Sequence, residues 1–165
     1  MSNVIKLRGI IKFDPKDVTK KHLKQSNWKK IAMVMFEGDI CEYYSWWVNR
    51  RYNLKLNKPL RGGHITFIND RSSEIKGDWS EVKKKYNNKP IDIILDLTPK
   101  TDSNNKGSTY HWWLSLPEKN RKELHDIRLE LGLGRPYWGL HMTIGHANPK
   151  QIEHSKYLHR CLTRK

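Results

Sequence analysis

Cysteine is scarce in this chain of 165 residues, which contains only two. Cys41 and Cys161 are far apart in the sequence, and no CxxC or Cys/His finger spacing occurs. A structural zinc site and a disulfide framework both need more cysteines at closer spacing. The sequence therefore predicts a protein of a reducing compartment.

Long apolar runs are also absent. Residues 1–6 lack the apolar stretch of a signal peptide, and no segment approaches the roughly 20 apolar residues that span a bilayer. We therefore expect a cytoplasmic protein that has no membrane partner.

Acidic residues are few relative to basic ones, since 17 Asp and Glu stand against 32 Lys and Arg and give a formal net charge of +15. Such a surplus predicts a polyanionic partner, such as RNA or a nucleotide. Solvated, lysine-rich surfaces would produce the same surplus. The seven Trp and seven Tyr residues could either fill the core or stack on bases.

Length and hydrophobic patterning predict one α+β domain over residues 1–165. Apolar and alternating segments indicate strands, whereas apolar positions at helical spacing behind a capping residue such as Asp39 or Asp78 indicate helices. Strands are expected at Val4–Phe13, Ile31–Phe36, His64–Ile68, Ile91–Leu97, His111–Leu116 and within Tyr137–His146. Helices are expected at Lys16–Lys30, from Asp39 to Asn53, at Trp79–Tyr86, after Pro117 and after Asn148, with a loop at Thr98–Thr109.

The strands and helices alternate in two similar halves, and each half ends near an HxT tripeptide: His64-Ile65-Thr66 and His141-Met142-Thr143. In a strand, residues i and i+2 face one side and residue i+1 faces the other. Each strand can therefore bury its apolar residue and present one imidazole and one hydroxyl together.

Two facing histidines suit the cleavage of a phosphodiester. One neutral imidazole accepts a proton from the attacking hydroxyl or water, and a protonated imidazole donates one to the leaving oxygen. The threonine hydroxyls would hold the non-bridging oxygens. This chemistry requires no metal, and we expect no cofactor.

The segments Gly63-His64-Ile65-Thr66-Phe67 and Gly139-Leu140-His141-Met142-Thr143-Ile144 resemble the two signature motifs of the 2H phosphoesterase superfamily. The resemblance implies the LigT-like fold, a two-lobed α+β protein whose pseudo-twofold antiparallel sheets form a concave cleft with helices on the outside. It implies catalytic roles for His64, Thr66, His141 and Thr143. It also implies a phosphodiesterase, here expected to be a monomer, that acts on cyclic or on 2′-5′ or 3′-5′ oligonucleotides. Viral members often destroy nucleotide immune signals, which would place this chain in a host cytoplasm.

Five further residues are candidates for contacting a nucleotide substrate: Arg61, Tyr110, Trp112, Tyr137 and Trp138. Arg61 precedes the first motif and could hold a phosphate bidentately, or it could be a surface arginine. The aromatic rings could stack on bases or pack in the core. Because Trp112 and Trp113 are neighbours in one expected strand, one of them should be buried and the other more exposed.

Metal binding by His111, His141 and His146 is not expected, because positions five apart in a regular strand face opposite sides. Two alternative functions stay open. One is an RNA-end-processing enzyme, either a 2′,3′-cyclic phosphodiesterase or a 2′-5′ RNA ligase-like protein. The other is a non-catalytic RNA-binding module that holds single strands with basic and aromatic side chains.

Overall fold

The computed structural model describes residues 3–15, 29–59, 61–103 and 109–153. The helix expected at Lys16–Lys30 lies outside these ranges except for its last two residues, which belong to a strand. Within the described ranges, no helix is both long and apolar enough to cross a membrane.

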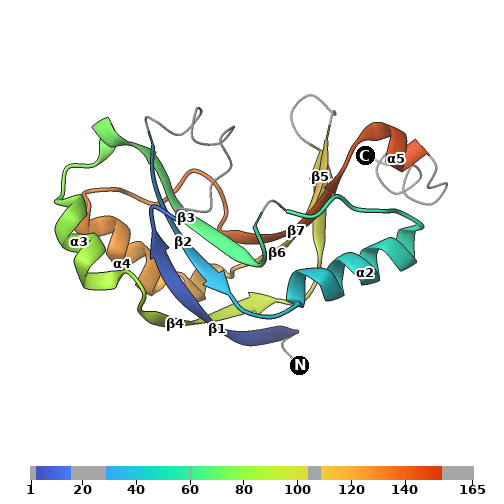
Figure 1. Cartoon of the computed structure of the whole chain (residues 1–165), viewed down its shortest axis with the longest axis horizontal. Helices are drawn as coiled ribbons and strands as arrows, with labels where there is room; N and C mark the ends of the chain where they lie inside the picture. Colours follow the sequence, from blue (N-terminus) through green and yellow to red (C-terminus); the bar gives the residue numbers. More distant parts are fainter. Residues whose placement is uncertain (1–2, 16–28, 60, 104–108, 154–165) are drawn as a thin grey trace.

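Seven antiparallel strands form one sheet in the order β4-β1-β2-β3-β7-β6-β5. They are β1 (Val4–Phe13), β2 (Lys29–Phe36), β3 (His64–Arg71), β4 (Pro90–Asp96), β5 (Lys100–Ser103), β6 (Tyr110–Ser115) and β7 (His141–Ala147). The sheet curves, and its two halves rise on either side of the place where β3 meets β7 (Figure 1). The prediction of an α+β fold is confirmed.

One predicted loop is wrong, because Thr98–Thr109 contains the edge strand β5. Its residues Thr101 and Asp102 pair with Trp112 and His111 of β6. The segment is short and polar, as edge strands often are, and its pairing with β6 rather than its own composition makes it a strand.

The described helices are α2 (Ile40–Tyr52), α3 (Trp79–Tyr86), α4 (Lys122–Glu130) and α5 (Pro149–Glu153), with short 3-10 helices at Ser72–Glu74 and Glu118–Asn120. Figure 1 shows α3 and α4 alongside the half of the sheet that contains β1, β2 and β3, and α2 alongside the half that contains β5, β6 and β7. Asp78 caps α3 as predicted, because its carboxylate accepts the backbone N–H groups of Ser80 and Glu81. Asp39 is the N-cap residue of α2, as predicted, but the predicted capping box is wrong, because the Asp39 side chain makes no capping hydrogen bond and Glu42 instead pairs with Lys58 at 2.5 Å.

The sheet has two unlike faces, as the alternation of the strands requires. The core face carries Ile11, Val34, Ile65, Leu114 and Met142, each of which is at most 1% exposed. Apolar side chains of the helices, such as those of α2 and α4, pack against it. The opposite side, which we call the histidine face, carries the polar residues of both HxT segments.

The chain repeats one arrangement twice. Strand β1, strand β2, helix α2 and strand β3 are followed later by β5, β6, α4 and β7 in the same order. In the sheet, β1-β2-β3 is mirrored by β5-β6-β7, and the two copies meet at β3 and β7. The strand β4 is added outside the first copy. The two copies therefore share one order of elements, although β5, the first strand of the second copy, lies in the segment that the sequence analysis assigned to a loop.

The register of pairing repeats as well. In the first half, β3 bulges between its pairs Ile68 with Ala32 and Thr66 with Met33, which leaves Phe67 as the extra residue. The second half has the same irregularity between Trp112 and Trp113 of β6, and it leaves Ile144 of β7 as the extra residue. Each bulge thus falls on the residue directly after an HxT threonine.

A helix of the other copy donates a hydrogen bond to each bulge from the core face of the sheet. The guanidinium of Arg128 in α4 donates to the carbonyl of Phe67 at 2.7 Å. In α2, the Ser45 hydroxyl donates to the carbonyl of Ile144 at 2.9 Å. Both donors are buried, so each satisfies a carbonyl that the bulge withdraws from the strand ladder.

Candidate active site

The two HxT segments lie side by side at the centre of the sheet. Strand β3 pairs with β7 through Ile65 and Met142. In antiparallel strands, this register puts His64 opposite Thr143 and Thr66 opposite His141, with all four side chains on the same face. The histidines then lie on a diagonal as neighbours roughly 7–8 Å apart, with a somewhat shorter distance between their Cβ atoms. The sheet therefore brings the two HxT segments together on one face, and the catalytic roles of these four residues stay a prediction.

Both imidazole rings are held in the same way. The Nδ1 atom of His64 lies 2.9 Å from the carbonyl oxygen of Gly62, and Nδ1 of His141 lies 2.6 Å from that of Gly139. In each pair Nδ1–H donates to the carbonyl, which leaves Nε2 to accept or donate a proton. The ring nitrogens that remain for chemistry are therefore the two Nε2 atoms.

The strand that enters each motif is also fixed by equivalent backbone bonds. The Phe36 N–H donates to the carbonyl of Gly63, and the Leu116 N–H donates to that of Leu140, both at 2.9 Å. These carbonyls belong to the residues directly before His64 and His141. Each histidine is thus anchored through its ring and through the preceding peptide.

Burial lowers the pKa of His64 below its ordinary value, and the positive charges of Arg61 and His141 lower it further, against the hydrogen bond to Gly62, which raises it. A lowered pKa keeps His64 neutral near pH 7, the form that accepts a proton. Arg61 is half-buried and close enough to act on this ring. The sequence-based expectation that Arg61 lies beside the first motif agrees with this position.

The sequence-based choice of Trp112 as a ligand contact is not supported, because Trp112 is 1% exposed and lies in the core. Tyr110 has the same orientation in β6 and packs against the core. Trp113 faces the other way and is half-buried, with its ring centroid 5.9 Å from that of His141. Trp113 is therefore the tryptophan of β6 that a ligand on the histidine face would meet.

The remaining aromatic candidates, Tyr137 and Trp138, differ from each other. Tyr137 is 97% exposed, whereas Trp138 is half-buried and packs against the core. The Trp138 indole N–H donates to the carbonyl of Thr66 at 3.5 Å, and its ring lies under the guanidinium of Arg128. Trp138 thus supports β3, and Tyr137 is the more accessible ring of the pair.

The bulge at Ile144 overturns the argument that His146 faces away from His141. Strand β6 is regular, and its residues His111 and Trp113 pair with His146 and Thr143. All of these side chains therefore share the histidine face with His141. Even so, among the residues that the structure describes, no three His, Cys, Asp or Glu side chains gather closely enough to hold a metal ion.

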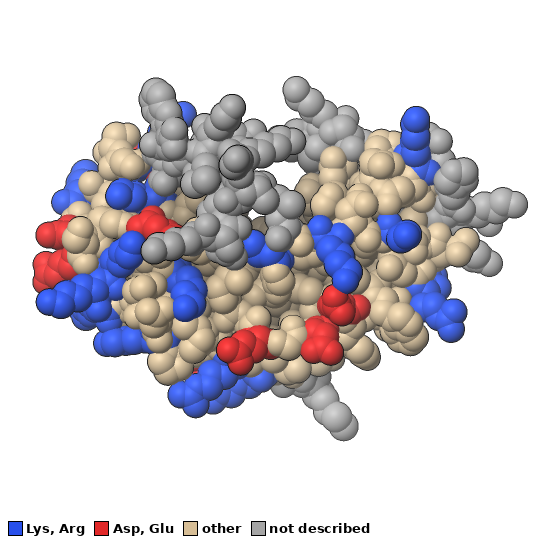
Figure 2. Space-filling view, viewed as in Figure 1, with Lys and Arg blue, Asp and Glu red and all other residues tan. Residues whose placement is uncertain are grey.

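Positive charge is spread over the face of the molecule that Figure 2 shows. Figure 2 shows Lys and Arg side chains distributed across the face in view, with Asp and Glu side chains gathered at its left and lower edges. Several lysines are paired locally, such as Lys83 with Asp14 and Lys85 with Glu130. The alternation of side chains along β1 and β5 places two lysines on the histidine face. They are Lys12, which pairs with Met33, and Lys100, which pairs with Trp113.

Comparisons with known proteins identify no relative: no family model, curated protein or solved structure matches the chain.

Proposed function

We propose that the protein is a metal-independent phosphodiesterase that cleaves small RNA-like phosphodiesters by two-histidine general acid–base catalysis. One observation carries the proposal. His64, Thr66, His141 and Thr143 share one face at the junction of β3 and β7, and each ring is held by Nδ1 so that Nε2 is available.

In the proposed mechanism, the phosphate lies between the two rings. Nε2 of His64 takes the proton from the attacking 2′-hydroxyl or water, because the lowered pKa of His64 favours its neutral form. Nε2 of His141, protonated, gives a proton to the leaving oxygen as the P–O bond breaks. The hydroxyls of Thr66 and Thr143 donate hydrogen bonds to the non-bridging oxygens as negative charge develops there.

The internal repeat supports membership of the 2H phosphoesterase superfamily and a two-lobed, LigT-like arrangement. Each half supplies one HxT strand, one bulge after the threonine and one helix behind the bulge of the other half. A pseudo-twofold relation of this kind would place two equivalent histidines on opposite sides of a single phosphate. Degradation of nucleotide immune signals in a host cytoplasm is the biological role that we propose.

A substrate panel tests the proposal. The purified chain would be incubated in excess chelator with 2′,3′-cyclic nucleotides, 2′-5′ and 3′-5′ oligoadenylates, and cyclic di- and trinucleotides, and the products would be identified by mass spectrometry. We expect turnover of at least one cyclic or short linear substrate. Preference for long RNA ends would favour the RNA-repair alternative, and salt-dependent binding without turnover would favour a binding module.

The pH dependence of kcat/KM should report the free His64 imidazole. Because protonated His64 cannot act as a base and its pKa is lowered, the rate should fall on the acid side through a midpoint below pH 6.5. Arg61→Gln removes a positive charge that lowers this pKa, so the midpoint should move to higher pH, whereas Arg71→Gln should leave it in place. An acid midpoint above pH 6.5, or one that Arg61→Gln does not move, would contradict this assignment.

Trp113 should serve as a stacking surface for a base next to His141. Stacking on an aromatic side chain contributes about 1–3 kcal/mol per base, so Trp113→Ala should raise KM about tenfold or more. Trp113→Phe should retain most of the affinity, and Trp46→Ala, at an exposed position on α2, is the matched control. An unchanged KM in Trp113→Ala would show that the base lies elsewhere.

A further inference from the structure

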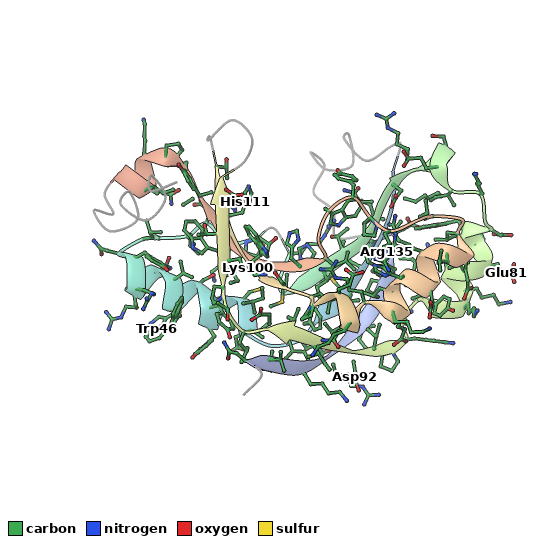
Figure 3. All side chains as sticks on the ribbon, turned by 180° about the vertical axis from the view of Figure 1, so that it is seen from behind. Trp46, Glu81, Asp92, Lys100, His111 and Arg135 are labelled. Carbon is green, nitrogen blue, oxygen red and sulfur yellow. The ribbon has the colours of Figure 1, made fainter. Side chains whose placement is uncertain are left out.

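A second pair of histidines lies on the histidine face beyond Trp113. The ring centroids of His111 in β6 and His146 in β7 are 6.1 Å apart, with 33° between the ring planes. The two residues are directly paired in the strand register. Figure 3, in which the molecule is seen from behind, shows His111 and Lys100 on the half that contains β5 and α2, away from Arg135 and Glu81.

The backbone of His146 is fixed by hydrogen bonds to a neighbouring segment. Its backbone N–H donates to the carbonyl of Asn57 at 3.0 Å, and the Asn57 N–H donates back at 2.8 Å. Gly145 makes this approach feasible, since a Cβ there would lie 2.9 Å from the Asn57 carbonyl oxygen. The ring of His146 is therefore held beside the exposed ring of His111.

The internal repeat does not require this pair. At the equivalent register of the first half, Ile31 pairs with Asn69. Among the residues that the structure describes, the equivalent position on the other side of the proposed active site thus carries no second histidine pair, although the strand register is the same on both sides. A further group of the substrate would lie on one side of the active site, and residues found in one half of the repeat are suited to bind it.

We infer that His111 and His146 bind a second phosphate of the substrate, one nucleotide away from the phosphate at His64 and His141. Successive residues on one side of a strand are about 6.6 Å apart, so Trp113 lies one step along β6 between the two histidine pairs. A base on Trp113 would then link two phosphates, one at each pair. The inference rests on the proposed function and selects substrates with at least two phosphates, such as trinucleotides or cyclic oligonucleotides.

Phosphate binding at this pair should depend on the protonation state of the His111 imidazole. Burial lowers the pKa of His111, and the positive charges of His146 and His141 lower it further. The acidic group that faces it is Asp102 of β5, opposite His111 in register. A bound phosphate would favour the charged imidazole, so binding near neutral pH should be accompanied by proton uptake.

The test compares linear diadenylate, which has one phosphodiester, with triadenylate, which has two. In His111→Gln and His146→Gln, we expect KM for triadenylate to rise about tenfold, the size of a charge-assisted hydrogen bond, with kcat unchanged. The kinetics of diadenylate should not change. His125→Gln, on α4, is the matched control, and Asp102→Asn should lower KM for triadenylate because it removes a negative charge that repels the phosphate. Equal effects on both substrates, or no effect on either, would overturn the inference.

Calorimetric binding to His64→Ala separates this inference from the proposed function. Titrations in two buffers of different ionisation enthalpy should show more proton uptake for triadenylate than for diadenylate, and His111→Gln should abolish the difference. If the wild type cleaves no phosphodiester but this difference is observed, the proposed function fails and the phosphate site stands. If cleavage occurs and the two ligands show equal proton uptake, the phosphate site is wrong.

Discussion

Replacing His64 or His141 with alanine should reduce the rate of phosphodiester cleavage by about two to four orders of magnitude. Each substitution removes one of the two Nε2 atoms that the Nδ1 contacts to Gly62 and Gly139 leave available. The loss should appear in kcat, because proton transfer occurs in the transition state. Single-turnover cleavage of the best substrate in chelator, followed by mass spectrometry, measures it.

Two comparisons make this experiment specific. His125→Ala removes a histidine from α4 and should leave the rate unchanged. The double variant His64→Ala/His141→Ala should lose little more than the worse single variant, because a proton acceptor and a proton donor that act in one step are not additive. If either single variant retains the wild-type rate, that histidine has no part in the mechanism.

The alternation rule was sufficient to predict the composition of the proposed site. It put His64 with Thr66 and His141 with Thr143, each with its apolar neighbour behind, and the structure has them so. What no local rule could supply was the pairing of β3 with β7, which joins residues 77 positions apart. The resemblance of both segments to the HxT motifs indicated that they form one site. The sheet order, in which β3 is next to β7, places them in contact.

The second histidine pair could not be predicted, because it depends on a bulge. A bulge at Ile144 shifts the register by one residue and turns His146 to the same side as His141, the reverse of what regular alternation requires. The carbonyl of Ile144 accepts a hydrogen bond from the Ser45 hydroxyl of α2, a tertiary contact that the local sequence does not reveal. The burial of Trp112 rather than Trp113 follows instead from the regular alternation of β6, in which Trp112 shares the core face with Leu114.

The buried ion pair between Arg128 and Asp70 should be the most sensitive point for stability in the described part of the chain. Their side chains are 3% and 13% exposed, and the guanidinium donates to both carboxylate oxygens at 2.8 and 3.1 Å. It also donates to the carbonyls of Phe67 and Gly134. Arg128→Met would leave a buried carboxylate and two carbonyls without these donors.

We expect Arg128→Met to lower the free energy of unfolding by about 3–5 kcal/mol, the cost of removing one partner of a buried pair. Urea denaturation measures the change, with Arg135→Met as control, because the Arg135 pair with Glu118 is exposed and such pairs contribute at most about 1 kcal/mol. An equal loss in the two variants would contradict the expectation.

The double variant Arg128→Met/Asp70→Asn separates charge from packing. Replacing Asp70 with asparagine removes the uncompensated carboxylate, so the double variant should be more stable than Arg128→Met alone, with a coupling energy of about 1–3 kcal/mol. The part that is not recovered belongs to the carbonyls of Gly134 and of Phe67, the latter at the bulge after Thr66. Because that bulge sets the direction of the strand that carries His64, the unrecovered part should be accompanied by a lower kcat, which ties the stability of this pair to the geometry of the proposed site.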